Sequence, residues 1–478
     1  MQNKQFKFKS KGAFWLIACC IGILGWIPAF GQTETLSLTQ ALEMAFKADY
    51  QVKSDRNNLE KSKLAVKKAA LNILPQATVE GQYQYQTTDD TYPNAYQIVV
   101  QQTIPTSYNL YGQKIVTDIE AAMWDQVTAE ATLQIDQANV IYNTYEYYIN
   151  VLKAQQVLKL QEAALAKYQE DSALAAKQLS LGKITKPDQL KTENSLNQAQ
   201  FDLEKDRSDL EIALQKLANQ IGLKDLADYQ LAEMGPAAET IDGQLAALQQ
   251  KALQRRLELQ TKEITIKQAG RTWAQAKNDE LPTVSVSYNS QNQMQSFGLS
   301  YDFLKGDFSW LAAHKDESYQ TQTDALSGNT NDNYYGAKKR YFTLKLKWSL
   351  DFGTAANQAK QAQYTLDNAK LDLEKERQDI LLDVAQASAD YQLAVKQHEL
   401  NQKALLYYEK DVEVKETQRK LGMLTFTDLS DARQDLLDAR IAAVKSAYDR
   451  VLAVQKLKKA VGDLYPFDHL SKLEGKQP

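Results

Sequence analysis

Two long stretches of this chain contain almost no residue that breaks a helix. One runs from Gln113 to Ser180 and the other from Thr354 to Lys420, about 68 and 67 residues. At 1.5 Å per residue, each would form a helix of roughly 100 Å, far longer than the helices of compact domains. Only nine prolines occur among 478 residues, which also favours long helices. The sequence therefore predicts an elongated, mainly α-helical protein.

The sequence also contains an internal duplication. At an offset of 207 residues, "LSLTQALEMAF" (36–46) matches "GQLAALQQKAL" (243–253), and Leu74-Pro75 matches Leu281-Pro282. At an offset of 240, Leu181-Gly182 matches Leu421-Gly422, and "KLANQIG" (216–222) matches "KLKKAVG" (456–462). A fixed internal spacing indicates a repeated structural unit. We therefore predict two repeats, 32–238 and 239–478, with 33 inserted residues in the second.

Within each repeat, the spacing of hydrophobic residues changes after the Leu-Pro junction, from the helical period of about 3.6 residues to the strand period of two. The predicted strands lie within 75–112 and 282–353, and the helical parts cover 36–74, 113–222, 243–281 and 354–462. Alternation is clear in "QATVEGQYQYQ" (76–86), "TVSVSYN" (283–289) and "YFTLKLKWSLDF" (341–352), and weaker near 97–104. This gives four strands per chain. Residues 291–340 replace a loop of about ten residues in the first repeat. A long extracellular loop is expected there, although "SFGLSYDF" also alternates.

These strands fit either a small half-buried sheet of a soluble domain or the wall of a transmembrane barrel. The barrel explains why their polar face carries Lys, Glu and Gln, which a packed core would not accept unpaired. Aromatic residues near the strand ends are candidates for membrane-facing positions: Tyr83, Tyr85, Tyr341, Trp348 and Phe352. Four strands cannot close a barrel, so several chains must share it. A dimer would give 8 strands and a trimer 12, and the trimer leaves the useful bore.

The two Leu-Gly turns are predicted to end the helices at the far tips of two helical hairpins. Gly182 and Gly422 suit the left-handed position that follows a helix C-terminus. Thr185 and Thr425 can cap the next helices, with an aspartate three residues further on. Helices attached to a closed ring of strands would form a tube. A solid coiled coil without a bore is the alternative.

The first 31 residues resemble a secretory signal peptide. Four lysines precede an apolar run, and "AFG" (29–31) precedes a cut at Gln32. A membrane anchor, or a lipoprotein cleavage box at "LIAC" (16–19), is the alternative. Both cysteines lie in this segment, so the mature chain would have no disulfide.

The remaining composition points away from nucleic acids and from enzymes. Removal of the four leader lysines leaves 52 basic and 60 acidic residues, a net charge of −8. The three histidines are scattered, and no phosphate loop, nucleophile elbow or paired metal ligands occur in the sequence. We therefore expect no catalytic residue, no metal and no cofactor.

The order of these features resembles the TolC family of outer-membrane efflux proteins across about residues 36–465. The resemblance rests on the duplicated unit, both Leu-Pro junctions, the strand leading into "LDFGTAANQAKQAQ", and both Leu-Gly-x-x-Thr tips. It implies a homotrimer with a 12-stranded barrel in outer-membrane lipid, a helical barrel in the periplasm, and an equatorial belt near 222–243 and 463–478. It also implies two partners, a periplasmic adaptor protein and an inner-membrane pump.

The resemblance further implies site residues. The tips that would meet the adaptor are Leu181, Gly182, Lys183, Thr185, Leu421, Gly422 and Thr425. An aperture of carboxylates would contain Asp428 and Asp431, although Asp428 also suits a helix N-terminus. Arg419 and Leu424 stand where the family's closed state uses a tyrosine and an arginine, so that latch does not transfer.

The function implied is a passive exit duct of a tripartite efflux pump or of a type I secretion system. A periplasmic structural or adaptor coiled coil is the rival interpretation.

Overall fold

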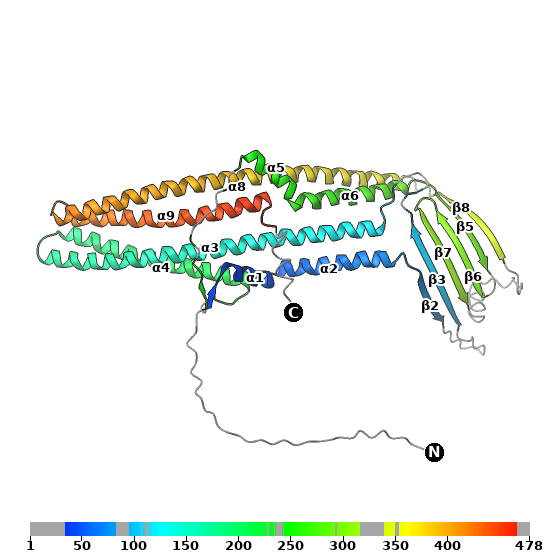
Figure 1. Ribbon diagram of the computed structural model, residues 1–478, viewed down its shortest axis with the longest axis horizontal. Helices are drawn as coiled ribbons and strands as arrows, with labels where there is room; N and C mark the ends of the chain where they lie inside the picture. Colours follow the sequence, from blue (N-terminus) through cyan, green and yellow to red (C-terminus); the bar gives the residue numbers. More distant parts are fainter. Residues whose placement is uncertain are drawn as a thin grey trace, which may run out of the picture.

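The computed structural model describes residues 34–82, 95–106, 108–109, 114–226, 229–233, 235, 241, 243–291, 294–315, 339–348 and 353–465. The predicted signal peptide, most of the predicted C-terminal belt segment, Tyr83, Tyr85 and Phe352 lie outside these residues. Helices run from two tips at one end to a β-sheet at the other (Figure 1). The mainly helical architecture predicted from the sequence is confirmed.

The duplication is visible in the order of the helices. α1 (Leu38–Ala48) and α2 (Tyr50–Leu71) correspond to α5 (Leu245–Arg255) and α6 (Leu257–Asn278), again at an offset of 207. The sequence predicted one helix before each Leu-Pro junction, but each is broken in two, at Asp49 and at Arg256. At the first break, the Asp49 carboxylate accepts a hydrogen bond from the Val52 amide and starts a new helix.

At the second break, Arg256 interacts mainly with groups that follow it. Its guanidinium donates to Glu258 at 3.0 Å and to the Ala460 carbonyl oxygen at 3.2 Å. This ties the break to the end of the chain's last helix. Helical periodicity continues across both breaks, which is why the pattern alone did not predict them.

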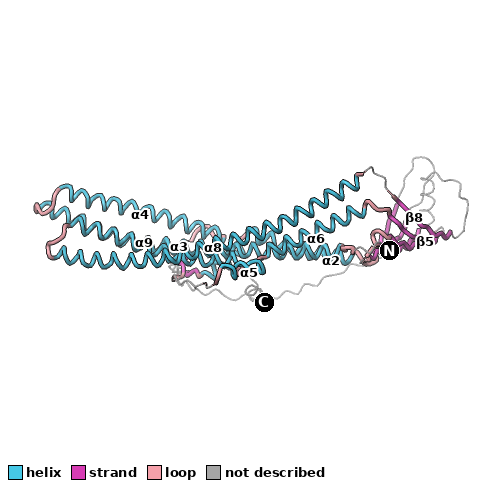
Figure 2. The backbone as a smooth tube through the Cα atoms, turned by 90° about the horizontal axis from the view of Figure 1, so that it is seen from above, coloured by secondary structure: helices cyan, strands magenta, loops and turns pink. Residues whose placement is uncertain are grey.

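The long helices match the predicted ones closely. They are α3 (Asp118–Ser180), α4 (Lys186–Ile221), α8 (Thr354–Lys420) and α9 (Phe426–Val461). α3 and α4 form one hairpin, α8 and α9 form the other, and α3 packs against α9 to join them. On the sheet side, α2 packs on α3, α3 on α6, and α6 on α8. α2 and α4 therefore lie at one edge of the bundle and α8 at the other (Figure 1). Figure 2 shows the same bundle from above, with the strands at the end opposite the tips.

A small two-stranded sheet, here called the belt, packs against the bundle, and one of its strands falls in the predicted equatorial segment 222–243. β1 (Glu34–Leu36) pairs in parallel with β4 (Tyr229–Leu231). The buried Tyr148 hydroxyl of α3 lies 3.0 Å from the carbonyl oxygens of Leu36 and Ala232, and so fixes this belt to the helices. The main hydrophobic core lies beneath it.

An acidic residue is buried beside this core. Asp55 of α2 is 4% exposed, and Gln51 donates to one of its carboxylate oxygens at 3.2 Å. Burial, assisted by the nearby Asp136 carboxylate, raises the pKa of Asp55 to about 6.

Among the described residues, the sheet contains the four predicted strands and two more. They are β2 (Gln76–Gln82), β3 (Ala95–Pro105), β5 (Thr283–Gln291), β6 (Gln295–Asp302), β7 (Asp307–Lys315) and β8 (Lys339–Lys347). The order is β2-β3-β7-β6-β5-β8, with every neighbouring pair antiparallel. β6 and β7 fall in the insertion, where the sequence predicted mainly a loop. Within the described residues, no helix combines the length and apolarity needed to cross a membrane.

Candidate functional site

The two tips have the same backbone geometry, because each helix ends on a glycine in the left-handed region. Gly182 has φ +67° and Gly422 has φ +76°. The Lys183 amide donates to the Gln178 carbonyl oxygen, and the Met423 amide donates to that of Gln418, both at 2.9 Å. This is the hydrogen-bond pattern of a Schellman turn, so the predicted role of both glycines is confirmed.

Each tip then starts a new helix with the predicted threonine cap. The Asp188 amide donates to the Thr185 hydroxyl, and the Asp428 amide donates to the Thr425 hydroxyl at 3.2 Å. The Asp188 carboxylate accepts from the Thr185 hydroxyl and amide, and these bonds lower the pKa of Asp188. The Thr425 hydroxyl likewise bonds to the Asp428 carboxylate. Asp428 thus acts as a helix N-terminal acid, the alternative considered above for this residue.

Asp431 forms an ion pair between the two hairpins. Its carboxylate lies 2.7 Å from the Lys191 ammonium of α4. The two residues are separated by 240 positions, so equivalent sites in the two repeats carry opposite charges and meet. Both side chains are about half exposed, so the pair itself contributes little stability. The sequence pointed to Asp431 but not to Lys191.

A more buried cluster connects three helices behind the tips. Arg433 of α9 donates to both carboxylate oxygens of Asp171 in α3, at 3.1 and 3.0 Å, and to Glu416 in α8 at 3.0 Å. Burial lowers the pKa of Arg433, but its bonds to Glu416 and Asp171 outweigh burial and raise it. The cluster therefore holds a charged guanidinium between the hairpins. Its residues lie far apart in the sequence, so no local pattern pointed to it.

Two neighbouring contacts reinforce the junction. Arg419 donates to the Leu424 carbonyl oxygen at 3.2 Å and to the Gln178 side chain at 3.3 Å, which links the second tip to the first hairpin. Tyr168 bonds to Gln434, and burial raises the pKa of Tyr168 to about 12. Arg419 thus makes a contact between hairpins at a position where the family's latch residue is missing.

The tips expose three large apolar side chains beside polar residues such as Lys183 and Thr185. Leu181, Leu421 and Met423 are 61%, 70% and 74% exposed. Large apolar side chains usually become buried, so their exposure at both turns indicates a surface suited to a partner.

The two edges of the bundle carry exposed apolar stripes. On α8 the exposed residues are spaced by seven or eleven: Tyr364, Leu371, Leu382, Leu393, Leu400, Tyr407 and Val414. At the opposite edge, α2 and α4 expose Tyr50, Leu64, Leu71, Leu190, Phe201 and Ile212. Spacings of seven and eleven keep a stripe on one side of a long helix. Both edges therefore present faces that a neighbouring helix can cover.

Of the predicted membrane-facing aromatics, the structure describes two. Trp348 continues the β8 alternation of Phe342, Leu344 and Leu346 and is 64% exposed. Tyr341 pairs with Asn289 and shares the face of Thr343 and Lys345. The apolar face of β8 thus contains Trp348 but not Tyr341, and lipid contact of these aromatics stays a prediction.

The comparisons with known proteins agree with this geometry. The model of the outer membrane efflux protein family matches residues 41–223 and 248–463, well over half of the chain. The chain belongs to the outer membrane efflux protein family. Proteins of this family are channels of the outer membrane that extend into the periplasm, not enzymes, and this chain shares that place and class. The resemblance to the TolC family is thereby confirmed.

Solved structures support the fold of this efflux protein. The Campylobacter jejuni CmeC outer membrane channel is 15% identical with a TM-score of 0.65, over 92% of this chain and 88% of CmeC. The open state of the Neisseria gonorrhoeae MtrE outer membrane channel is 17% identical with a TM-score of 0.65, over 89% and 88%. Vibrio cholerae VceC is 13% identical with a TM-score of 0.64, over 89% and 96%. No curated protein sequence matches the chain significantly.

Proposed function

We propose that three copies of this efflux protein form the exit duct of a tripartite efflux pump or a type I secretion system. The duct is passive, and an inner-membrane pump supplies the energy. The observation that carries the proposal is the pair of apolar stripes at opposite edges of one protomer.

The stripes favour a closed ring. A head-to-tail interface uses two different surfaces of each subunit, and it closes when the rotation fits. α8 of one copy would pack on α2 and α4 of the next. Leu400 and Phe201 lie 22 and 19 residues from their tip glycines, so both are about 30 Å from the tips. The sheet edges β2 and β8 would pair in the same ring, because an open edge is not stable in lipid.

The tips are the proposed contact for a periplasmic adaptor. Both turns expose a leucine beside a rigid glycine turn, and Lys183, Thr185 and Thr425 lie next to these leucines. A helical hairpin with apolar residues at its own tip would cover both leucines. Two similar turns per chain give six in a trimer.

Asp428 and Asp431 are the proposed aperture. Three copies would bring six carboxylates to the narrow end, where a ring of negative charge favours cations. Lys191 offsets the charge of Asp431 while the pair in α4 and α9 is formed. Asp428→Asn with Asp431→Asn should therefore lower the cation preference in planar bilayers, and Lys191→Gln should raise it. Unchanged ion selectivity in all variants would remove the aperture assignment.

Photo-crosslinking in cells tests the docking proposal. A photo-reactive residue replaces Lys183 at the first tip or, as the control, the exposed Lys267 of α6 on the sheet side. Mass spectrometry then identifies the captured proteins. We expect the tip variant alone to capture an adaptor protein.

The co-purified pump distinguishes the two systems. A proton-driven pump indicates efflux of small molecules or metal ions, and an ATP-driven transporter indicates protein or peptide secretion. Capture of no adaptor by the tip variant, with the protein still in the outer membrane, would contradict docking at the tips. A protein found only in soluble or inner-membrane fractions would contradict the duct itself.

A further inference from the structure

The inserted hairpin lies in the middle of the sheet, not at its edge. β7 pairs with β3 from Gln97–Lys315 to Pro105–Asp307, and β6 pairs with β5 from Ser285–Asp302 to Gln291–Ser296. The insertion therefore separates the strands of the first repeat from those of the second, and its removal would leave β3 and β5 as neighbours. Since β3 and β5 keep opposite directions, two extra strands preserve the antiparallel order.

The alternation between the two faces of the sheet continues across the insertion. Directly paired residues share a face, so each row of the sheet follows from the strand register. One apolar row is Leu344, Val286, Tyr301, Phe308 and Ile104. The adjacent row on the opposite face is Thr343, Ser287, Ser300, Ser309 and Thr103. The insertion supplies two members of each row, so in these two rows its faces match those of its neighbours.

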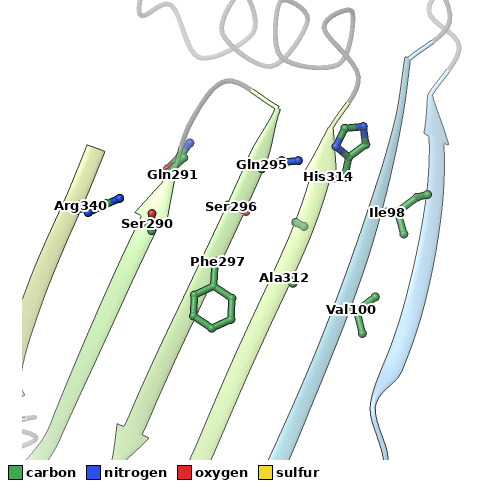
Figure 3. Close-up of a pocket in the computed structure, with 11 residues that line it drawn as sticks. Ile98, Val100, Ser290, Gln291, Gln295, Ser296, Phe297, Ala312, His314 and Arg340 are labelled. Carbon is green, nitrogen blue, oxygen red and sulfur yellow. The ribbon is translucent and has the colours of Figure 1, made fainter. Parts of the chain in front are cut away.

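At the outer end of the sheet the apolar face becomes mixed, because Arg340 of β8 pairs with Ser290 of β5. Phe297 of β6 and Ala312 of β7 lie in one row between Ser290 of β5 and Val100 of β3 (Figure 3). Polar side chains of Gln295 and His314 follow beyond this row, as expected where an apolar band ends.

Specific contacts fix the hairpin to the first repeat. On the apolar face, the Trp310 indole donates to the Gln102 amide oxygen at 2.8 Å, and the Gln102 amide nitrogen donates to the Ile73 carbonyl oxygen at 2.9 Å. A polar residue of β3 thus finds its partner in the insertion. This pairing is expected of a strand in the barrel wall, because an amide without a hydrogen-bond partner is costly on an apolar surface.

The turn between β6 and β7 also packs closely against the first repeat. The Thr106 amide donates to the Gly306 carbonyl oxygen at 2.7 Å. Gly306 has φ +66°, and a Cβ there would lie 2.5 Å from both the Thr106 hydroxyl oxygen and Ile115 Cδ1. The turn therefore rests against the segment that connects β3 to α3, at the helix end of the sheet.

The two inserted strands would change the diameter of the barrel. Strands spaced about 4.8 Å apart and tilted by about 40° each occupy roughly 6.3 Å of circumference. Twelve strands give a diameter of about 24 Å, whereas three sheets of six, or 18 strands, give about 36 Å. Among the described helices, α2, α3, α6 and α8 adjoin strands of the sheet along the chain, which makes four per copy. Twelve helices in a ring at about 9.5 Å spacing also give a diameter of about 36 Å.

We propose that the β6–β7 hairpin is part of the barrel wall, so that the trimer closes 18 strands into an outer mouth as wide as its helical tube. This rests on the proposed trimeric duct. The lumen face combines one row of hydroxyls with charged side chains of both signs, among them Lys345, Asp302 and Asp307. A mouth of this kind suits bulky hydrophilic cargo, such as a polypeptide, because the barrel adds no constriction beyond the tube.

Single cysteines test the wall assignment, since the two native cysteines lie in the predicted leader. Ser300→Cys and Leu299→Cys probe opposite faces of β6, and Ser287→Cys and Val286→Cys are the matched pair on β5. Intact cells are treated with a charged maleimide that does not enter lipid. We expect each serine-derived thiol to react at least ten-fold faster than its apolar-face neighbour.

The outcomes separate this inference from the proposed function. Alternation on β5 with equal labelling of Leu299→Cys and Ser300→Cys would overturn the wall role of the hairpin and leave the duct intact. Loss of alternation on β5 as well would refute the barrel. Electron cryo-microscopy of the purified trimer in nanodiscs then counts the strands. Eighteen strands support the inference, and a 12-stranded barrel with residues 295–315 outside its wall overturns it.

Discussion

The Arg433 cluster gives a quantitative prediction for the tip half of the bundle. Asp171 has a side chain that is only 9% exposed, so Arg433→Gln would leave its charge buried without its guanidinium partner. Breaking a buried ion pair from one side costs about 3–5 kcal/mol, and the 28% exposure of Arg433 reduces this to about 2 kcal/mol. Opening of the helices at the tips should then become about 30-fold more frequent.

Hydrogen exchange followed by mass spectrometry measures this directly. Peptides from the tip halves of α3 and α9 should exchange about 30-fold faster in the variant, and peptides from α6 should not change. Arg377→Gln is the matched control, because its pair with Glu374 is exposed and long at 3.7 Å. Unchanged exchange at the tips in Arg433→Gln would show that the cluster does not hold the hairpins together.

Three further predictions follow from buried groups of the bundle. The raised pKa of Asp55 means that the folded state binds a proton more tightly between pH 4 and 6, so stability falls as pH rises through that window, by about 3 kcal/mol. Thermal unfolding of Asp55→Asn should lack this fall, and an unaltered pH profile would contradict the assignment. Tyr148→Phe removes the buried hydroxyl that contacts the belt and should lower the free energy of unfolding by about 1–2 kcal/mol, measured with denaturant. An unchanged free energy of unfolding would show that this hydroxyl does not fix the belt. Gly222 has φ +77°, and Gly222→Ala would place a Cβ 2.5 Å from Ala48 Cβ. This variant should lower the Tm more than Gly182→Ala, which has open space around the new Cβ. Equal effects of the two variants would exclude the packing clash.

The sequence predicted the tips well because their determinants are local. A glycine in the left-handed region ends the helix, and a threonine within four residues caps the next one, whatever the rest of the chain does. The ends of α3 and α8 at Ser180 and Lys420 followed from this alone. The breaks at Asp49 and Arg256 were missed because apolar periodicity continues across both of them.

The cross-hairpin contacts and the extra strands were harder to foresee because their partners are distant in the sequence. Lys191 meets Asp431 across 240 residues, and Arg433 meets Asp171 across 262. The insertion shows alternation in "SFGLSYDF", but a strand needs a neighbour, and its neighbours belong to both repeats. Only the offset between the repeats could have signalled the Lys191–Asp431 pair in advance.

The central claim is that one protomer is a third of a ring closed by two different edges. A photo-reactive residue at Leu400 on the α8 stripe tests it in native membranes. The account predicts crosslinks to α4 of another copy near Phe201, with bands on a denaturing gel that stop at the trimer. Crosslinks from α8 to α8, bands that stop at a dimer, or no crosslink between copies would contradict it.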